Sequence, residues 1–195
     1  GDHTLYVQSW DVAGNASTVW SSPYKSDTSY PVISVTGASS AWQLSEPTIT
    51  LSVTDVTPGS GINYIKYRWD NSDVSGETSV ANGTVITMPS EGSHRLYVQA
   101  ADIAGNISTW NGFYKVDSHE PTVSADNASS AWNTGTIGSI TLELSDASPG
   151  SGIQRAVYNW NDPASSSIGN SYSNGSAISI PGEGSNTLYL YVKDH

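Results

Sequence analysis

Apolar and polar residues alternate with a period of two in short segments along the chain, which predicts β-strands that bury one face. Two corresponding segments carry the clearest alternation, with Ile49, Leu51 and Val53 in the first and Ile140, Leu142 and Leu144 in the second. Polar clusters such as "PGSG" and "AGN" separate these segments and are typical of turns. No long window shows the period of a helix. The pattern therefore predicts an all-β protein.

The strand pattern is repeated along the chain. Residues 3–15, "HTLYVQSWDVAGN", return at 94–106 as "HRLYVQAADIAGN", and their first half returns at 186–195 as "NTLYLYVKDH". A period of about 90 residues is too long for a solenoid repeat and fits a whole β-sandwich module. We expect the positions that stay apolar in every copy to face the core, namely Leu5 and Val7, Leu96 and Val98, and Leu188 and Leu190.

The repeats divide the chain into three parts. Residues 1–26 are predicted to be the last two strands of one module, 27–116 a complete module, and 117–195 a module that lacks its final strand. We expect about seven strands in a complete module, arranged as an antiparallel β-sandwich. Because the ends fall inside modules and the chain does not begin with Met, the sequence is interpreted as a piece of a longer precursor.

The string "LYVQAADIAGNIS" at 96–108 carries a family resemblance, together with the preceding "EGSH" and the following "YKVD" and Pro121. It resembles the bacterial immunoglobulin-like and fibronectin-type-III-like modules of large surface adhesins and secreted polysaccharide-degrading enzymes. The resemblance implies tandem Ig-like sandwiches and an extracellular or cell-surface location. The sequence departs from the fibronectin-like pattern where those modules often place a tyrosine, at Leu5, Leu96 and Leu188.

Charge and composition narrow the possible partners. The formal charge of −11 would repel nucleic acid and anionic lipid, so we expect no nucleic-acid partner. No apolar run approaches the roughly 20 residues that a membrane-spanning helix needs, and we expect no membrane insertion. The chain has no cysteine, so disulfides and thiolate metal sites are ruled out. Packing, hydrogen bonds or bound ions must stabilise the fold.

The repeated D-x-A-G-N sequence, at 102–106 in the complete module, has two interpretations. The first is a turn, in which Gly and Asn accept positive φ and the aspartate accepts backbone hydrogen bonds. The second is a calcium site, because in an Ig-like sandwich two loops and the incoming linker meet at one pole, and three carboxylates there offer the oxygen ligands that calcium prefers. The acids at the two poles are Asp27, Asp55 and Asp102, and Asp117, Asp146 and Asp194.

Two lysines offer an alternative to a bound ion. Lys25 and Lys115 each stand two residues before a linker aspartate, where an ammonium group would neutralise the pole. Pro31 and Pro121 follow the two linkers and restrict φ. With or without calcium, we therefore expect a semi-rigid joint between modules.

The sequence shows no catalytic centre, and we expect a non-enzymatic protein. His3 and His94 share one repeat position, but the third copy has Asn186 there, and His119 stands where the other linker has Ser29. No grouping of Ser, His and Asp recurs in both modules. Asp55 and Asp102 form the only acid pair that we considered for glycoside hydrolysis.

Outward-facing aromatic residues suggest carbohydrate binding, because a flat row of rings can stack against sugars. The alternative interpretation is that these rings close the sandwich edge or pack against a neighbouring module. The candidates are Tyr6, Tyr97, Tyr189, Trp42 and Trp132.

These observations favour a structural stalk or spacer in an extracellular tandem array, whose partners are the neighbouring Ig-like modules of the same chain. The alternative is a carbohydrate-binding accessory module of a secreted polysaccharide hydrolase. A third possibility is self-association into a fibre, in which the terminal strands of one copy complete the unfinished module of another.

Overall fold

The computed structural model describes residues 1–132, 138–165 and 167–195, and these contain β-strands and no helix. The described part of the chain therefore has no helix able to cross a membrane. The chain forms two compact units. The first comprises Gly1–Ser39, Pro47–Pro89 and His94–Tyr114, and the second comprises Ser40–Glu46, Ser90–Ser93 and Lys115–His195. Every named strand pair is antiparallel, which confirms the predicted all-β sandwich class.

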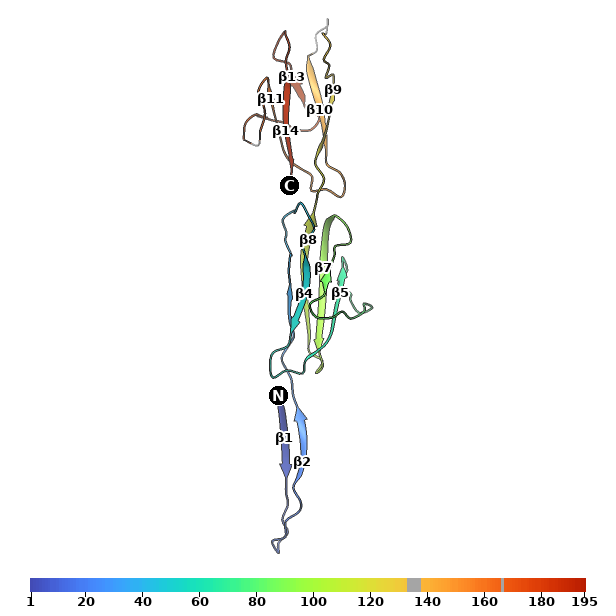
Figure 1. Cartoon of the computed structure of the whole chain (residues 1–195), viewed down its shortest axis with the longest axis vertical. Helices are drawn as coiled ribbons and strands as arrows, with labels where there is room; N and C mark the ends of the chain where they lie inside the picture. The colour runs from blue at the N-terminus through green and yellow to red at the C-terminus, as the bar shows by residue number, and fades with distance from the viewer. Residues whose placement is uncertain (133–137, 166) are drawn as a thin grey trace. The chain divides into compact units, whose positions relative to one another are not determined.

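The first unit contains a hairpin and a sandwich (Figure 1). The hairpin pairs β1 (Asp2–Val7) with β2 (Trp20–Lys25). One sandwich sheet has the order β3-β4-β6 and the other β5-β7-β8. The bounds of these six strands are Val32–Val35 for β3, Ile49–Thr54 for β4, Ile62–Trp69 for β5, Val85–Ile86 for β6, Gly92–Asp102 for β7 and Ile107–Val116 for β8.

The sandwich of the first unit has six named strands where the sequence suggested about seven. In the second unit a short strand pairs with the equivalent of β5. At that position in the first unit, the Val80 N–H donates to the Ile65 carbonyl at 2.8 Å, although no strand forms. The seventh element is thus an irregular segment.

The core of the first unit lies between its two sheets, as the alternation predicted. Ile49, Leu51 and Val53 of β4 are buried, and Leu96, Val98 and Ala100 of β7 are buried opposite them. Trp69 is half-buried and packs edge-on against Tyr114, with ring centroids 5.4 Å apart.

Tyr114 is a core residue that sequence reasoning missed. Its side chain is fully buried, and its hydroxyl donates to the Thr36 carbonyl at 2.7 Å. Burial raises the pKa of Tyr114 to about 12, because the phenolate would lose its hydration inside the core. This hydrogen bond joins the end of β8 to the segment that follows β3.

The second unit repeats the same plan, with sheets of order β9-β10-β13 and β12-β11-β14. Ile140, Leu142 and Leu144 of β10 are buried together with Ala156 and Ile178, so the predicted core face is confirmed here too. The bounds are Thr122–Asp126 for β9, Ser139–Ser145 for β10, Ile153–Trp160 for β11, Asn170–Ser171 for β12, Ala177–Ser179 for β13 and Leu188–Asp194 for β14.

An asparagine side chain completes the hydrogen bonding of the central strand in each sandwich. Asn82 donates to the Val53 carbonyl at 2.9 Å and accepts from the Val53 N–H at 2.8 Å. Asn174 makes the same two bonds with Leu144, at 3.0 and 2.6 Å. Each amide thereby satisfies a backbone donor and acceptor that a neighbouring strand would otherwise pair.

The hairpin shows what the repeated strand does without a second sheet. Leu5 of β1 occupies the repeat position of Leu96, yet Leu5 is 47% exposed whereas Leu96 is fully buried. Among the described residues, β1 and β2 form a sheet of their own with no further strand. The burial that the sequence predicted for Leu5 and Val7 is therefore absent here, because burial depends on a facing sheet.

This contrast gives a matched pair of substitutions. We expect Leu96→Ala to destabilise the sandwich of the first unit by about 2–5 kcal/mol, because a fully buried leucine leaves a cavity. Leu5→Ala should change the same transition by about 0.5 kcal/mol or less, because its side chain is half exposed. Denaturant unfolding of both variants checks this, and equal effects would show that the repeat position alone, without burial, sets the cost.

Candidate functional site

The D-x-A-G-N sequence forms the same turn in two environments. In the exposed hairpin, the Asn15 N–H donates to Asp11 Oδ1 at 2.8 Å, and its side-chain amide donates to Asp11 Oδ2 at 2.8 Å. In the sandwich, the backbone and side chain of Asn106 donate to Asp102 in the same way at 2.8 and 2.7 Å. Gly105 has a φ of 98°, a region that favours glycine. The aspartate and asparagine therefore define the turn through the same pair of hydrogen bonds in both places.

The "PGSG" loop binds the linker aspartate of the first unit. The Ser60 N–H donates to Asp27 Oδ2 at 2.6 Å, and the Ser29 N–H donates to Asp27 Oδ1 at 3.0 Å. The Asn106 amide also donates to the Asp27 carbonyl at 3.2 Å. Next in the loop, the Gly61 N–H donates to Asp55 Oδ2 at 2.7 Å. Backbone N–H groups and the Asn106 side-chain amide thus hold together the linker, the loop after β4 and the turn after β7.

The second unit repeats these contacts. Asp117 accepts from the His119 N–H at 3.1 Å and from the Ser151 N–H at 2.6 Å. Asp146 Oδ2 accepts from the Gly152 N–H at 2.5 Å. Asp117 is 3% exposed, and its pKa is lowered: burial alone would raise it, but the hydrogen bonds from Ser151 and the His119 backbone outweigh burial. The linker aspartate is therefore held as a carboxylate in both modules.

A glycine allows the loop to close around each aspartate. A Cβ on Gly59 would lie 2.5 Å from Asp55 Oδ2 and 2.5 Å from the Val56 carbonyl oxygen. A Cβ on Gly150 would lie equally close to Asp146 Oδ2, at 2.5 Å. The first glycine of "PGSG" is thus required for close approach, which the sequence alone did not reveal.

The structure brings the three predicted acids of the first pole together. Carboxylate oxygens of Asp27, Asp55 and Asp102 all lie within 4.8 Å of one another. Both oxygens of Asp27 and of Asp102 accept hydrogen bonds, as does Asp55 Oδ2. The remaining oxygen, Asp55 Oδ1, is buried and has no hydrogen-bond partner among the described residues. Hydrogen bonds within the loops therefore satisfy five of the six carboxylate oxygens, and only Asp55 Oδ1 has no partner among the described residues.

The two lysines do not neutralise this cluster. Lys25 Nζ lies 3.8 Å from Asp2 Oδ2, and Lys115 Nζ lies over the ring of Trp42, 5.7 Å from its centroid. No lysine or arginine of the described chain forms an ion pair with Asp27, Asp55 or Asp102. The pKa of Asp27 is lowered, first by its hydrogen bond with the Ser60 side chain and then by the Ser29 backbone. Three adjacent carboxylates thus lack a cationic side chain.

The second pole is arranged differently. Asp146 Oδ1 is buried without a hydrogen-bond partner among the described residues, as Asp55 Oδ1 is. Among the described residues, Asp117 belongs to one group of three possible metal ligands, and its partners there are Glu91 and His119. Asp194 is in neither group, so calcium binding by Asp117, Asp146 and Asp194 stays a prediction. Sequence reasoning missed Glu91 as a possible ligand, although "EGS" at 91–93 recurs at 183–185, because Asp117 and His119 lie far from it in the sequence.

The predicted carbohydrate-binding aromatics differ in exposure. Tyr6, Tyr189 and Trp132 are 68%, 40% and 84% exposed. Tyr97 lies beneath Arg95, whose guanidinium carbon is 5.3 Å from the ring centroid, and Trp42 lies beneath Lys115. Each of these two rings already packs against a cationic side chain, which is the contact a sugar would have to displace.

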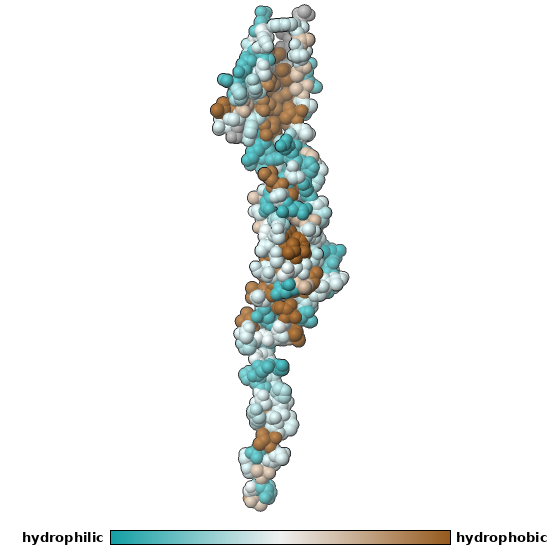
Figure 2. All heavy atoms as spheres, in the orientation of Figure 1, coloured by the Kyte–Doolittle hydropathy of each residue, from teal (hydrophilic) through white to brown (hydrophobic). Residues whose placement is uncertain are grey.

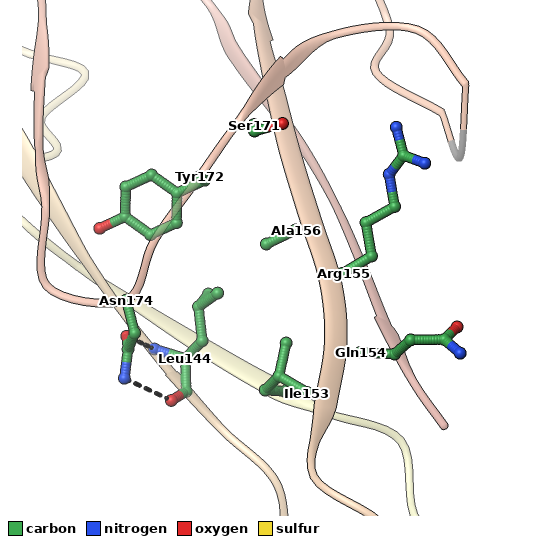
Figure 3. Close-up of a pocket in the computed structure, with 8 residues that line it drawn as sticks. All are labelled: Leu144, Ile153, Gln154, Arg155, Ala156, Ser171, Tyr172 and Asn174. Carbon is green, nitrogen blue, oxygen red and sulfur yellow. Dashed lines mark hydrogen bonds between the residues drawn. The ribbon is translucent and has the colours of Figure 1, made fainter.

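A hollow lies beside the core of the second unit (Figure 3). It measures about 390 Å³ and is lined by Leu144, Ile153, Gln154, Arg155, Ala156, Ser171, Tyr172 and Asn174. In Figure 3, Gln154 and Arg155 point away from Tyr172 and Ala156, and both polar and apolar side chains line the hollow. Figure 2 shows apolar residues gathered on this unit. The Tyr172 hydroxyl already bonds the Leu142 backbone at 2.9 and 2.7 Å.

The acid pair considered for glycoside hydrolysis is not placed for that chemistry. Asp102 is fully buried, and its carboxylate is occupied by Asn106. No titratable acid lines the hollow in the second unit. Comparison with protein-family models and with curated proteins finds no match to this chain. The hydrogen bonds of the linker aspartates therefore remain the feature that both units share at this site.

The close approach at Gly59 predicts a specific sensitivity. Gly59→Ala should destabilise the sandwich of the first unit by about 1–3 kcal/mol, because the loop must shift away from Asp55. Gly76→Ala is the control, since nothing lies within 4 Å of a Cβ added there. Thermal or denaturant unfolding of the two variants measures the difference. A Gly59→Ala protein as stable as the control would mean that the loop does not close on Asp55 in solution.

Proposed function

We propose that this chain is a structural spacer segment of an extracellular tandem array, with no catalytic role. The observation that carries the proposal is the twice-repeated attachment of the linker aspartate. Asp27 and Asp117 each accept one hydrogen bond from within the linker and one from the "PGSG" loop. A linker held at both carboxylate oxygens loses conformational freedom, as a spacer that transmits position along a chain requires.

The chemistry of the surface supports the same role. The formal charge of −11 keeps copies of the chain apart, and the buried apolar faces of the antiparallel sheets stabilise each sandwich. The partners of a spacer are the neighbouring modules of its own chain. The carbohydrate-binding alternative has less support, because Tyr97 and Trp42 are covered by Arg95 and Lys115.

We further propose that calcium binds at Asp27, Asp55 and Asp102 in the first unit. Their carboxylates converge within 4.8 Å, and Asp55 Oδ1 is a buried oxygen with no hydrogen-bond partner among the described residues. A hard divalent cation would bind this oxygen and offset two of the three negative charges, with waters completing the 6–8 oxygen ligands that calcium takes. The ion would add to the hydrogen bonds that already hold the linker.

The spacer role predicts that Asp117 restricts the linker. The chain has no cysteine, so Ser72→Cys in the first unit and Ser185→Cys in the second allow two spin labels to be placed cleanly. We expect a narrow distribution of label distances that broadens in Asp117→Ala, because the Ser151 and His119 hydrogen bonds are lost. Asp162→Ala, an exposed aspartate of the same unit, is the control. An already broad distribution in the parent protein would contradict the spacer role.

The calcium site predicts a cation-dependent melting temperature. At 100 times its Kd, an ion that binds only the folded state adds about 2.7 kcal/mol, so melting of the first unit should rise in calcium relative to EDTA. Asp55→Asn should abolish this rise. Asp146→Asn is the matched control, since it changes the same repeat position in the second unit, where the described residues form no three-aspartate group. Superimposable melts of the parent protein in calcium and EDTA would eliminate the calcium site and leave the spacer role untouched.

A further inference from the structure

A second group of metal-ligating side chains lies in the second unit and contains a histidine. The group consists of Glu91, Asp117 and His119, whose donor atoms all lie within 4.8 Å of one another. His119 Nδ1 is 2.8 Å from Glu91 Oε2 and 4.0 Å from Asp117 Oδ1. The two carboxylates and the imidazole therefore face a common point.

Hydrogen bonds from other residues hold the side chains of Glu91 and Asp117 in place. Asp117 is buried, and the His119 and Ser151 N–H groups bind its two oxygens. The Ser118 hydroxyl donates to Glu91 Oε1, which directs Oε2 toward the imidazole. Such outer contacts orient ligands before a metal arrives and lower the cost of ordering them on binding. His119 is half exposed, so an ion can reach the group from solvent.

We propose that Glu91, Asp117 and His119 form a binding site for a first-row divalent metal ion such as Zn²⁺, distinct from the aspartate cluster of the first unit. Zn²⁺ bonds to histidine nitrogen and carboxylate oxygen at about 2.0–2.2 Å, so two ligands on one tetrahedral ion lie about 3.3 Å apart. The distances of 2.8 and 4.0 Å from His119 Nδ1 bracket that value. Three protein ligands leave the fourth position for water.

The donor set favours this class of ion over calcium. Calcium prefers six to eight oxygen ligands, whereas imidazole nitrogen suits zinc, nickel and cobalt. The equivalent position in the other linker is Ser29, which has no such donor. The site is therefore specific to the second linker. An ion there would connect the linker to the segment just before β7, a contact that the hydrogen bonds of Asp117 do not make.

The test is calorimetric titration of the whole chain with Zn²⁺, combined with NMR of its four histidine rings. We expect one binding site and a shift of the His119 ring signals. His119→Ser, which installs the residue of the other linker, and Glu91→Gln should each weaken binding at least about tenfold. His3→Asn is the control, because it installs the residue found at the third repeat position, Asn186, and should leave the affinity unchanged.

Several outcomes would overturn the proposal. Absence of Zn²⁺ binding to the parent chain would show that the group is an ion pair only. Undiminished affinity in His119→Ser, or ring shifts confined to His3 and His195, would place the ion elsewhere. Binding that weakens in Asp55→Asn and persists in His119→Ser would assign it to the aspartate cluster. None of these results depends on whether the chain acts as a spacer.

Discussion

The hydrogen bonds between a linker carboxylate and the backbone N–H groups of the "PGSG" loop organise both units. Each bond is charge-assisted, and such bonds are about twice as strong as those between neutral groups. The Ser60 N–H reaches Asp27 and the Ser151 N–H reaches Asp117, both at 2.6 Å. The start of each module is thereby defined by its own linker, and the loop, the turn and the aspartates of the candidate calcium site all depend on this contact.

Carboxylates that lie close together around that contact repel one another, and the side chains beside them differ between the two units. In the first unit Asp27 has Asp55 and Asp102 as neighbours, and the described residues offer no cationic side chain to balance them. In the second unit Asp117 has the His119 imidazole within 4.0 Å, a nitrogen donor that the three-aspartate group lacks. The same backbone scaffold therefore supports an oxygen-only group at one pole and a mixed nitrogen and oxygen group at the other.

Much of this architecture was predictable, because the alternation of apolar and polar residues and the repeated segments can be read directly from the sequence. The buried faces of β4 and β10 follow directly from Ile49, Leu51, Val53 and their counterparts. The convergence of Asp27, Asp55 and Asp102 followed from the expected loop positions. Glu91 and Tyr114 were not found, since each acts through a partner far away in the sequence. The role of Gly59 was also hidden, because a glycine needed for close approach looks like any turn glycine until the loop is placed.

The residue that follows β5, and its counterpart after β11, keep the same backbone conformation and backbone hydrogen bond but differ in side chain. Asp70 and Asn161 both have positive φ, at 57° and 63°, and each accepts a backbone N–H through its Oδ1, from Arg95 and Thr187. Their second side-chain contact differs: Asp70 pairs with His94 at 2.7 Å, whereas Asn161 donates to Asn186 at 3.2 Å. Asp and Asn tolerate this backbone conformation equally well. The two units therefore share the turn and its backbone bond, while the side chain is free to differ between them, as it does at Ser29 and His119.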